Sequence, residues 1–254
     1  MPTRDRRFGE FCWINIMTPQ PSSARVFFAS LLGWAYDEMP GLGHLVLVGR
    51  SPIGGLFDLD GPGTPPGVPP HIGVMVKVAD ADAIGAKAAE LGGRSRPAFD
   101  VMDNGRMACC HDPNGAAFDV WQPRQKPGTD VDSTLHGAPS WFETLTSDTG
   151  RAGAFYTGLF GWQVEPMDGS HYLTFRLGDD FVGGMMRITA DMGDFPPHWG
   201  VYFTVDDVDA AERQARELGA TICVPAQDVP GVGRFCGAIS PQGGSFYMIR
   251  YGSD

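Results

Sequence analysis

The chain has 254 residues, of which 43% are hydrophobic and 19% are charged, and its formal net charge at pH 7 is -11. This length allows two domains of ordinary size, each with its own core. The acidic charge argues against nucleic acid or an anionic membrane as a partner, because both require clustered lysine and arginine. No run of about 18 apolar residues occurs, and no apolar segment follows the basic run 4–7, so we expect a cytoplasmic protein whose basic run is a frayed tail.

The apolar pattern of the first half predicts short elements in a fixed order. A strand is expected over 10–17 and a helix over 20–32, where Pro21 suits the first turn and Gly33 the end. Strands are then expected over 34–39, 44–48 and 53–59. A loop with five prolines and three glycines covers 61–70. After it the order restarts, with a strand over 72–78, a helix over 80–91 and strands over 98–101, 107–111 and 117–121.

The second half of the chain repeats the first. Phe27–Trp34 reads FFASLLGW, and 128 positions later Phe155–Trp162 reads FYTGLFGW. Three such blocks recur at an offset of 128 and one at 127. A solenoid repeats every 20–50 residues or so, and this period is far longer. We therefore predict an α+β fold of four βαβββ units in two domains, 1–122 and 138–254, joined by a polar linker over 123–137.

Five cysteines are present: Cys12, Cys109, Cys110, Cys223 and Cys236. Their number is odd and no C-x-x-C pair occurs, so neither a disulfide framework nor a zinc ribbon is indicated. We interpret them as small, buried apolar side chains.

The tandem units, the F-[FY]-x-x-L-[LF]-G-W helix and the final G-R-x-x-x-x-x-D-P-x-G hairpin resemble the vicinal oxygen chelate superfamily. That superfamily includes glyoxalase I, extradiol dioxygenases and bleomycin-binding proteins. The closest resemblance is to two-domain, hydroxylase-like proteins of the 27 kDa antigen type, whose copies open with a strand like Trp13–Ile16. The resemblance implies that paired units curl into a glyoxalase-like half-barrel whose concave face holds a ligand. In metal-dependent members a divalent ion on that face chelates two substrate oxygens.

Of the positions at which such members hold their ion, the first copy keeps at most one ligand, the shortened acid Asp119, and the second copy keeps none apart from the weak ligand Tyr247. In order along each copy, these positions are Trp13, Gly73 and Asp119, and Trp141, Gly200 and Tyr247. Indole cannot ligate a hard cation, and glycine has no side chain to do so. A displaced site for Zn, Fe, Mn or Ni could use Glu143, His198 and Tyr247, or else Asn15, His71 and Asp119. We favour no metal and no other cofactor.

Aromatic side chains instead predict a pocket for a flat or hydrophobic small molecule. Phe142 and Phe246 are counted among its walls. The residues expected to bind the ligand are Trp13, Asn15, Phe57, Asp119, Trp121, Trp141, Glu143 and Tyr247. Arg106 could bind an anionic group, but we expect it to pair with Asp100.

Three functions stay open. The first, which we favour, is a glyoxalase/bleomycin resistance-like protein that binds a small molecule in a deep aromatic pocket without the family's metal. The second is a metal-dependent lyase, isomerase or dioxygenase with a displaced site. The third is a non-catalytic interaction module with a filled barrel. No nucleophile, phosphate-binding or dinucleotide motif assigns catalytic residues. A monomer or a homodimer fits the internal repeat.

Overall fold

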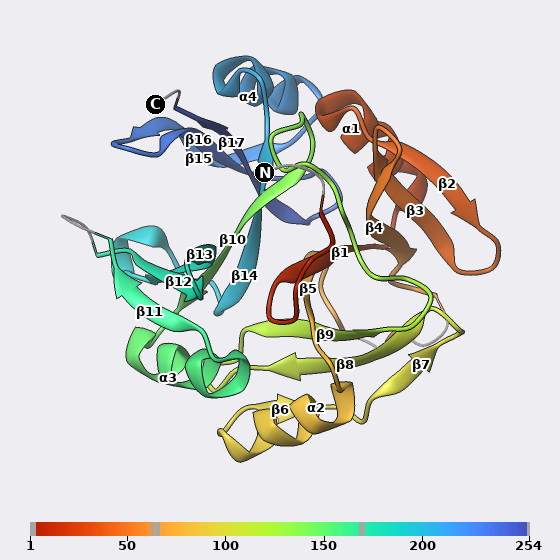
Figure 1. Cartoon of the computed structure of the whole chain (residues 1–254). Helices are drawn as coiled ribbons and strands as arrows, with labels where there is room; N and C mark the ends of the chain where they lie inside the picture. Colours follow the sequence, from red (N-terminus) through yellow and green to blue (C-terminus); the bar gives the residue numbers. More distant parts are fainter. Residues whose placement is uncertain (1–3, 62–63, 65–66, 168–170, 253–254) are drawn as a thin grey trace.

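The computed structural model describes residues 4–61, 64, 67–167 and 171–252 and confirms an α+β fold of two curled sheets, one from each half of the chain (Figure 1). The first half contains β1 (Phe11–Thr18), α1 (Pro21–Leu32), β2 (Ala35–Met39), β3 (Gly43–Val48), β4 (Ser51–Asp58), β5 (His71–Lys77), α2 (Ala81–Glu90), β6 (Arg94–Ser95), β7 (Phe99–Val101), β8 (Gly105–His111) and β9 (Ala117–Pro123).

The second half repeats this order. It contains β10 (Pro139–Thr146), α3 (Thr149–Phe160), β11 (Gln163–Pro166), β12 (Leu173–Leu177), β13 (Asp180–Arg187), the 3₁₀ turn η1 (Ala190–Met192), β14 (His198–Thr204), α4 (Val208–Glu217), β15 (Thr221–Val229), β16 (Gly233–Ile239) and β17 (Ser245–Tyr251). None of the helices in the described part of the chain is long and apolar enough to cross a membrane.

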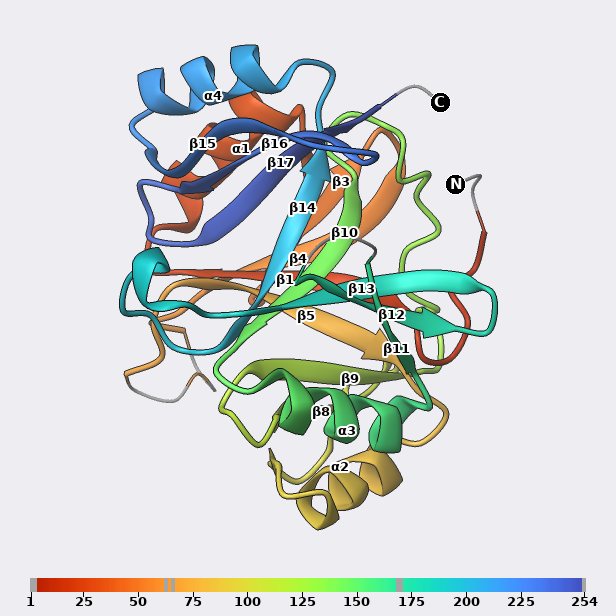
Figure 2. The same cartoon turned by 90° about the vertical axis from the view of Figure 1, so that its left-hand side faces the viewer.

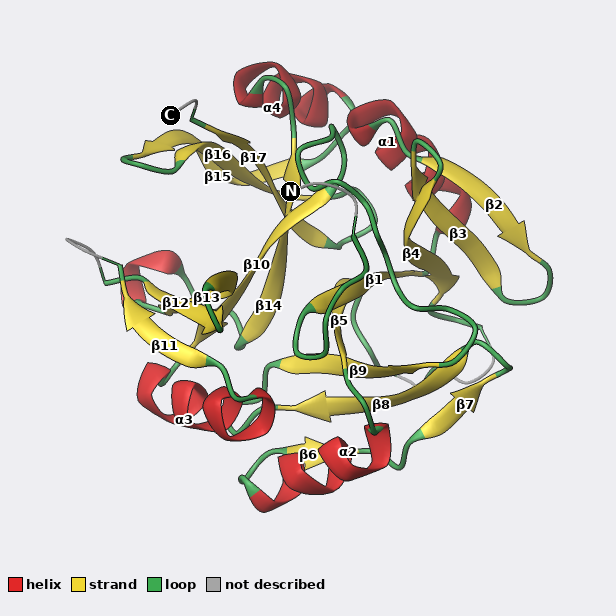
Figure 3. Ribbon diagram, in the orientation of Figure 1, coloured by secondary structure: helices red, strands yellow, loops and turns green. Residues whose placement is uncertain are grey.

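Each sheet joins two βαβββ units through their first strands. In the first sheet β1 pairs antiparallel with β5, and the order is β2-β3-β4-β1-β5-β9-β8-β6, with β7 beside β8. In the second sheet β10 pairs with β14, and the order is β11-β12-β13-β10-β14-β17-β16-β15. The first strands therefore lie at the centre of each curl, where a ligand on the concave face would meet them (Figure 3).

The two halves share one hydrophobic core, because the first helix of each half packs against the sheet of the other. Helix α1 lies beside α4, and its Phe28 meets Phe246 of β17 with ring centroids 5.5 Å apart. Helix α3 lies beside α2, and its Phe155 meets Phe118 of β9 at 6.0 Å. Figure 2 shows α3 against β8 and β9 from the side. Separating the halves would expose this aromatic surface to water.

A reciprocal pair of hydrogen bonds explains the G-W ending of the repeated helix. Trp34 Nε1 donates to the carbonyl of Gly137, and Trp162 Nε1 donates to that of Gly9, each at 2.8 Å. Both acceptors lie just before the first strand of the opposite half and have positive φ, 78° and 87°, which glycine adopts readily. The repeated tryptophans therefore fasten each half to the other.

The basic run near the start of the chain is not frayed, contrary to our prediction. Glu10 is buried and accepts hydrogen bonds from the guanidinium groups of both Arg4 and Arg7. Arg7 also forms an ion pair at 2.6 Å with Asp180 of the second half. The run is ordered because it neutralises two acidic groups at the junction of the halves.

The cysteines only partly follow the prediction. All five are free, and Cys12, Cys110 and Cys236 are buried, but Cys109 is half-buried and Cys223 is exposed.

Candidate functional site

The candidate site lies on the face of the second sheet that points away from the first half. Successive side chains of a strand alternate between its faces. Phe142 of β10 stacks on Phe11 of the first half, with ring centroids 4.1 Å apart. Its neighbours Trp141 and Glu143 therefore point to the opposite, concave face.

Glu143 is a buried carboxyl group at the centre of this face, with 3% of its surface exposed. Its Oε1 accepts a hydrogen bond from the hydroxyl of Tyr202 at 3.2 Å, and the hydroxyl of Tyr172 also bonds to the carboxyl. Burial raises the pKa of Glu143 to about 7, although both tyrosine bonds oppose the rise. The group can therefore hold or release a proton near neutral pH.

Aromatic rings surround this carboxyl. Trp141 Nε1 donates to the Tyr172 hydroxyl at 2.7 Å, so indole, phenol and carboxyl form a chain. Tyr202 stacks on Tyr247 of β17 at 4.4 Å with 14° between the ring planes. Burial raises the pKa of all three phenols, which keeps them protonated as hydrogen-bond donors.

Glycines make room for these rings. A Cβ atom on Gly184, which faces Glu143 across the β10–β13 pair, would collide with the Tyr172 hydroxyl. A Cβ atom on Gly200 would lie 2.6 Å from the ring of Tyr247. The second half-barrel thus fills its own concave face with tyrosine side chains.

The first half-barrel holds a different set of groups. Asn15 Nδ2 donates to Asp119 Oδ2 at 3.4 Å, and burial raises the pKa of Asp119. Trp121 is buried with Cys12 and Met75, and its Nε1 donates to the Lys126 carbonyl at 2.8 Å. The linker therefore closes over one side of this interior.

Two further predicted residues belong to the same interior. Trp13 packs against the cluster that contains Trp121. Phe57 lies over Gly55, where its ring occupies the space of a Cβ atom.

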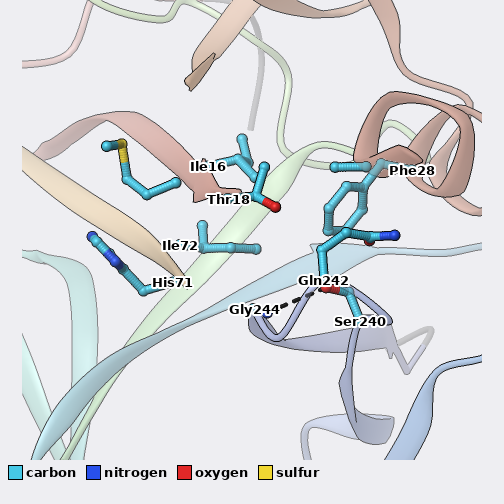
Figure 4. A pocket seen from close by; sticks show the side chains of 10 residues that line it. Ile16, Thr18, Phe28, His71, Ile72, Ser240, Gln242 and Gly244 are labelled. Atoms are coloured by element: carbon cyan, nitrogen blue, oxygen red, sulfur yellow. Dashed lines mark hydrogen bonds between the residues drawn. The ribbon is translucent and has the colours of Figure 1, made fainter. Parts of the chain in front are cut away.

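The deep aromatic pocket stays a prediction, because the two hollows outlined by the structure lie elsewhere. The crevice in Figure 4 lies where β1, α1 and β5 meet the β16–β17 turn and has no room for a water molecule. A hollow of about 410 Å³ lies beside Leu59 and Val68. Neither hollow is lined by a predicted ligand-binding residue.

Proteins of similar sequence identify the family of the chain, although no family model matches it. The chain is 36% identical to a Mycobacterium tuberculosis (strain CDC 1551 / Oshkosh) protein named "Putative glyoxylase CFP32", over 98% of both chains. The chain belongs to the vicinal oxygen chelate superfamily. It is also 31% identical to "Anthracycline biosynthesis protein DnrV" of Streptomyces peucetius, over 95% of this chain and 93% of that one.

Solved structures of the superfamily share the architecture at low sequence identity. The Mn(II)-bound glyoxalase from Novosphingobium aromaticivorans has a TM-score of 0.67 and 16% identity, over 96% of this chain and 82% of that one. The 2,3-dioxygenase LapB from Pseudomonas sp. KL28 has a TM-score of 0.66 and 12% identity, over 96% and 92%. At such identities these likenesses establish the fold only.

The metal-binding positions of the superfamily do not fit a metal ion in this chain. Gly73 and Gly200 offer no side chain, and the Trp141 indole donates its only N–H to Tyr172. Glu143 is already bonded to two tyrosine hydroxyls. Among the described residues no three His, Cys, Asp or Glu side chains gather closely enough to hold an ion.

The structure brings together only part of each displaced set of metal ligands. The structure brings Asn15 and Asp119 together, with His71 close enough to act on the carboxyl electrostatically. His71 Nδ1 donates to the Pro69 carbonyl at 2.8 Å. In the second half His198 makes the same turn bond to the Pro196 carbonyl at 2.9 Å, while Glu143 turns to its tyrosines.

Phe142 and Phe246 do not line the concave faces, contrary to our prediction. Both lie in the core between the halves, because they occupy the other face of their strands. Conversely, Tyr172 and Tyr202 lie on this face and were not predicted. Tyr202 lies two positions after Gly200 and shares its face by the period of the strand, so that signal was present.

Arg106 pairs with Asp100 and also with Asp82, as Arg234 does with the matching acids. The interpretation of Arg106 as a structural residue is confirmed.

Proposed function

We propose that the protein binds a flat, hydrophobic or aromatic small molecule on the concave face of its second half-barrel, without the metal ion of the superfamily. The observation that carries this proposal is the aromatic wall of Trp141, Tyr202 and Tyr247 around one buried carboxyl, Glu143. Apolar walls with a single well-placed polar group are typical of small-molecule sites. The name of the DnrV relative supports a polycyclic aromatic ligand.

Direct titration tests this function. Tryptophan fluorescence would follow the addition of an anthracycline aglycone or of 1-naphthol to the wild-type protein. Removing the indole in Trp141→Ala should weaken binding about tenfold or more, since burial and ring contacts contribute a few kcal/mol. The matched control is Trp13→Ala in the first half-barrel, which should leave this affinity unchanged. Equal affinities for wild type and Trp141→Ala would count against the assignment.

The alternative of a metal-dependent enzyme draws on the Mn(II)-bound glyoxalase among the structural relatives. It requires a stoichiometric ion, which elemental mass spectrometry on untagged protein purified without chelator would detect. A stoichiometric metal ion lost in Asp119→Ala would place it in the first half-barrel and replace our proposal.

A further inference from the structure

Tyr172 occupies the place where a ligand ring would lie on the second half-barrel. It directly precedes β12, and its side chain reaches across Gly184 to the middle of the concave face. Its hydroxyl oxygen accepts a hydrogen bond from Trp141 Nε1 at 2.7 Å, and the hydroxyl also bonds to the carboxyl of Glu143. The Tyr172 hydroxyl is therefore hydrogen-bonded both as an acceptor and as a donor.

We propose that Trp141 and Glu143 form a recognition site for a phenolic hydroxyl, and that Tyr172 fills this site until a hydroxyaromatic ligand takes its place. This inference rests on the proposed function and names its ligand class.

The pair of partners is selective for a hydroxyl group. An indole N–H can only donate, and the ionised form of Glu143, which prevails above pH 7, can only accept, so the ligand atom between them must then do both. Under these conditions a ketone would satisfy Trp141 and leave Glu143 without its donor, and a ligand carboxylate would meet Glu143 as a like charge. A phenol satisfies both partners, and its ring would lie near the stacked pair Tyr202 and Tyr247.

The first half-barrel offers a contrast within the same molecule. Asn15 pairs with Gly55 as Glu143 pairs with Gly184, so Asn15 stands where Glu143 stands. Leu45 pairs with Gly55 as Thr174 pairs with Gly184, so Gly43, two positions before Leu45, stands where Tyr172 stands. Asn15 is engaged with Asp119 instead. At these two positions the first half-barrel therefore lacks both the phenol and the carboxyl group, so a variant in it can serve as the control.

Chemical rescue tests the inference, because p-cresol is the side chain of tyrosine as a free molecule. Tyr172→Ala should leave a cavity in front of Trp141 and Glu143, and p-cresol should raise the melting temperature of this variant saturably. Toluene fills the same space without a hydroxyl, so it should bind about tenfold more weakly. Leu45→Ala should show no preference for p-cresol over toluene. In Tyr172→Ala/Trp141→Phe the preference should fall sharply.

A second variant keeps the test decisive if Tyr172→Ala does not fold. Tyr172→Phe retains the ring but removes the hydroxyl that competes with the ligand. The wild-type protein would then bind 1-naphthol about tenfold more weakly than Tyr172→Phe does. Unchanged affinity for 1-naphthol, or equal rescue of Tyr172→Ala by p-cresol and toluene, would overturn the inference.

The two proposals fail in different ways. If Trp141→Ala weakens aromatic binding but neither Tyr172 variant responds as stated, a small-molecule site exists and the hydroxyl-reading device does not. If the wild-type protein and Tyr172→Phe bind no aromatic probe and p-cresol does not rescue Tyr172→Ala, both proposals fall.

Discussion

Glu143 should make the protein less stable as the pH rises, and the size of this effect follows from its environment. Burial raises the pKa of its carboxyl from an ordinary 4.5 to about 7 in the folded protein. Below pH 4.5 the group is protonated in both the folded and the unfolded chain. Between these values the unfolded chain releases the proton first, so the folded state loses about 3 kcal/mol, at about 1.4 kcal/mol per pKa unit. Above pH 7 the loss is complete.

The variant Glu143→Gln removes this titration and keeps the shape of the side chain. The free energy of unfolding, measured by urea denaturation with tryptophan fluorescence, should therefore rise in the variant relative to wild type by about 3 kcal/mol between pH 4.5 and pH 8. Other groups titrate equally in both proteins and cancel in the difference. Glu90→Gln, at the exposed end of α2, is the control and should track wild type. Parallel pH profiles for wild type and Glu143→Gln would refute the buried, proton-holding carboxyl.

Three further predictions concern the junction of the halves. Asp112→Ala should lower the free energy of unfolding, measured in urea, by about 2–4 kcal/mol. The reason is that this buried carboxylate accepts three backbone N–H bonds and one tyrosine hydroxyl bond. Ser240→Ala, at the matching turn of the second half, should cost less than about half as much. The two arginines lower the pKa of Glu10 to about 2 against the opposing effect of burial, so its carboxylate stabilises the fold above pH 4.5. The wild-type protein should lose this stabilisation as the pH falls toward 2. In Glu10→Gln the free energy of unfolding should depend less on pH over the same range. Trp162→Phe should cost more than about 1 kcal/mol, because it removes the bond to Gly9 and also leaves part of the space of a fully buried indole empty. A loss below about 1 kcal/mol in thermal unfolding would show that this bond contributes little.

Most of the fold could be predicted because the signals are local and occur twice. The helix from Pro21 ends at Gly33, as its pattern indicates, and Gly33 adopts the left-handed conformation with φ 66°. The concave placement of Glu143 followed from its spacing after Trp141. Phe142 was assigned to the same face as Trp141 and Glu143, although alternation along the strand places it on the other face, where it packs against Phe11.

The contents of the half-barrel were harder to predict, because they depend on contacts between distant segments. Tyr172 reaches Glu143 from a neighbouring hairpin, and only the register of β13 against β10 places Gly184 beneath it. The frayed tail was predicted from the composition of residues 4–7. It failed because Glu10 and Asp180 lie close to that run in space.

The two copies make the same contacts at their junction and differ in the residues of their concave faces. Trp34 and Trp162 make the same bond to the opposite half, so the junction keeps its twofold pattern. On the concave faces a carboxyl comes from β9 in one half, as Asp119, and from β10 in the other, as Glu143. Burial raises the pKa of both of these carboxyl groups, but their hydrogen-bond partners differ. A shared core relieves each copy of stabilising itself alone, and this leaves the concave residues free to diverge, so we expect one chain to present two unlike sites.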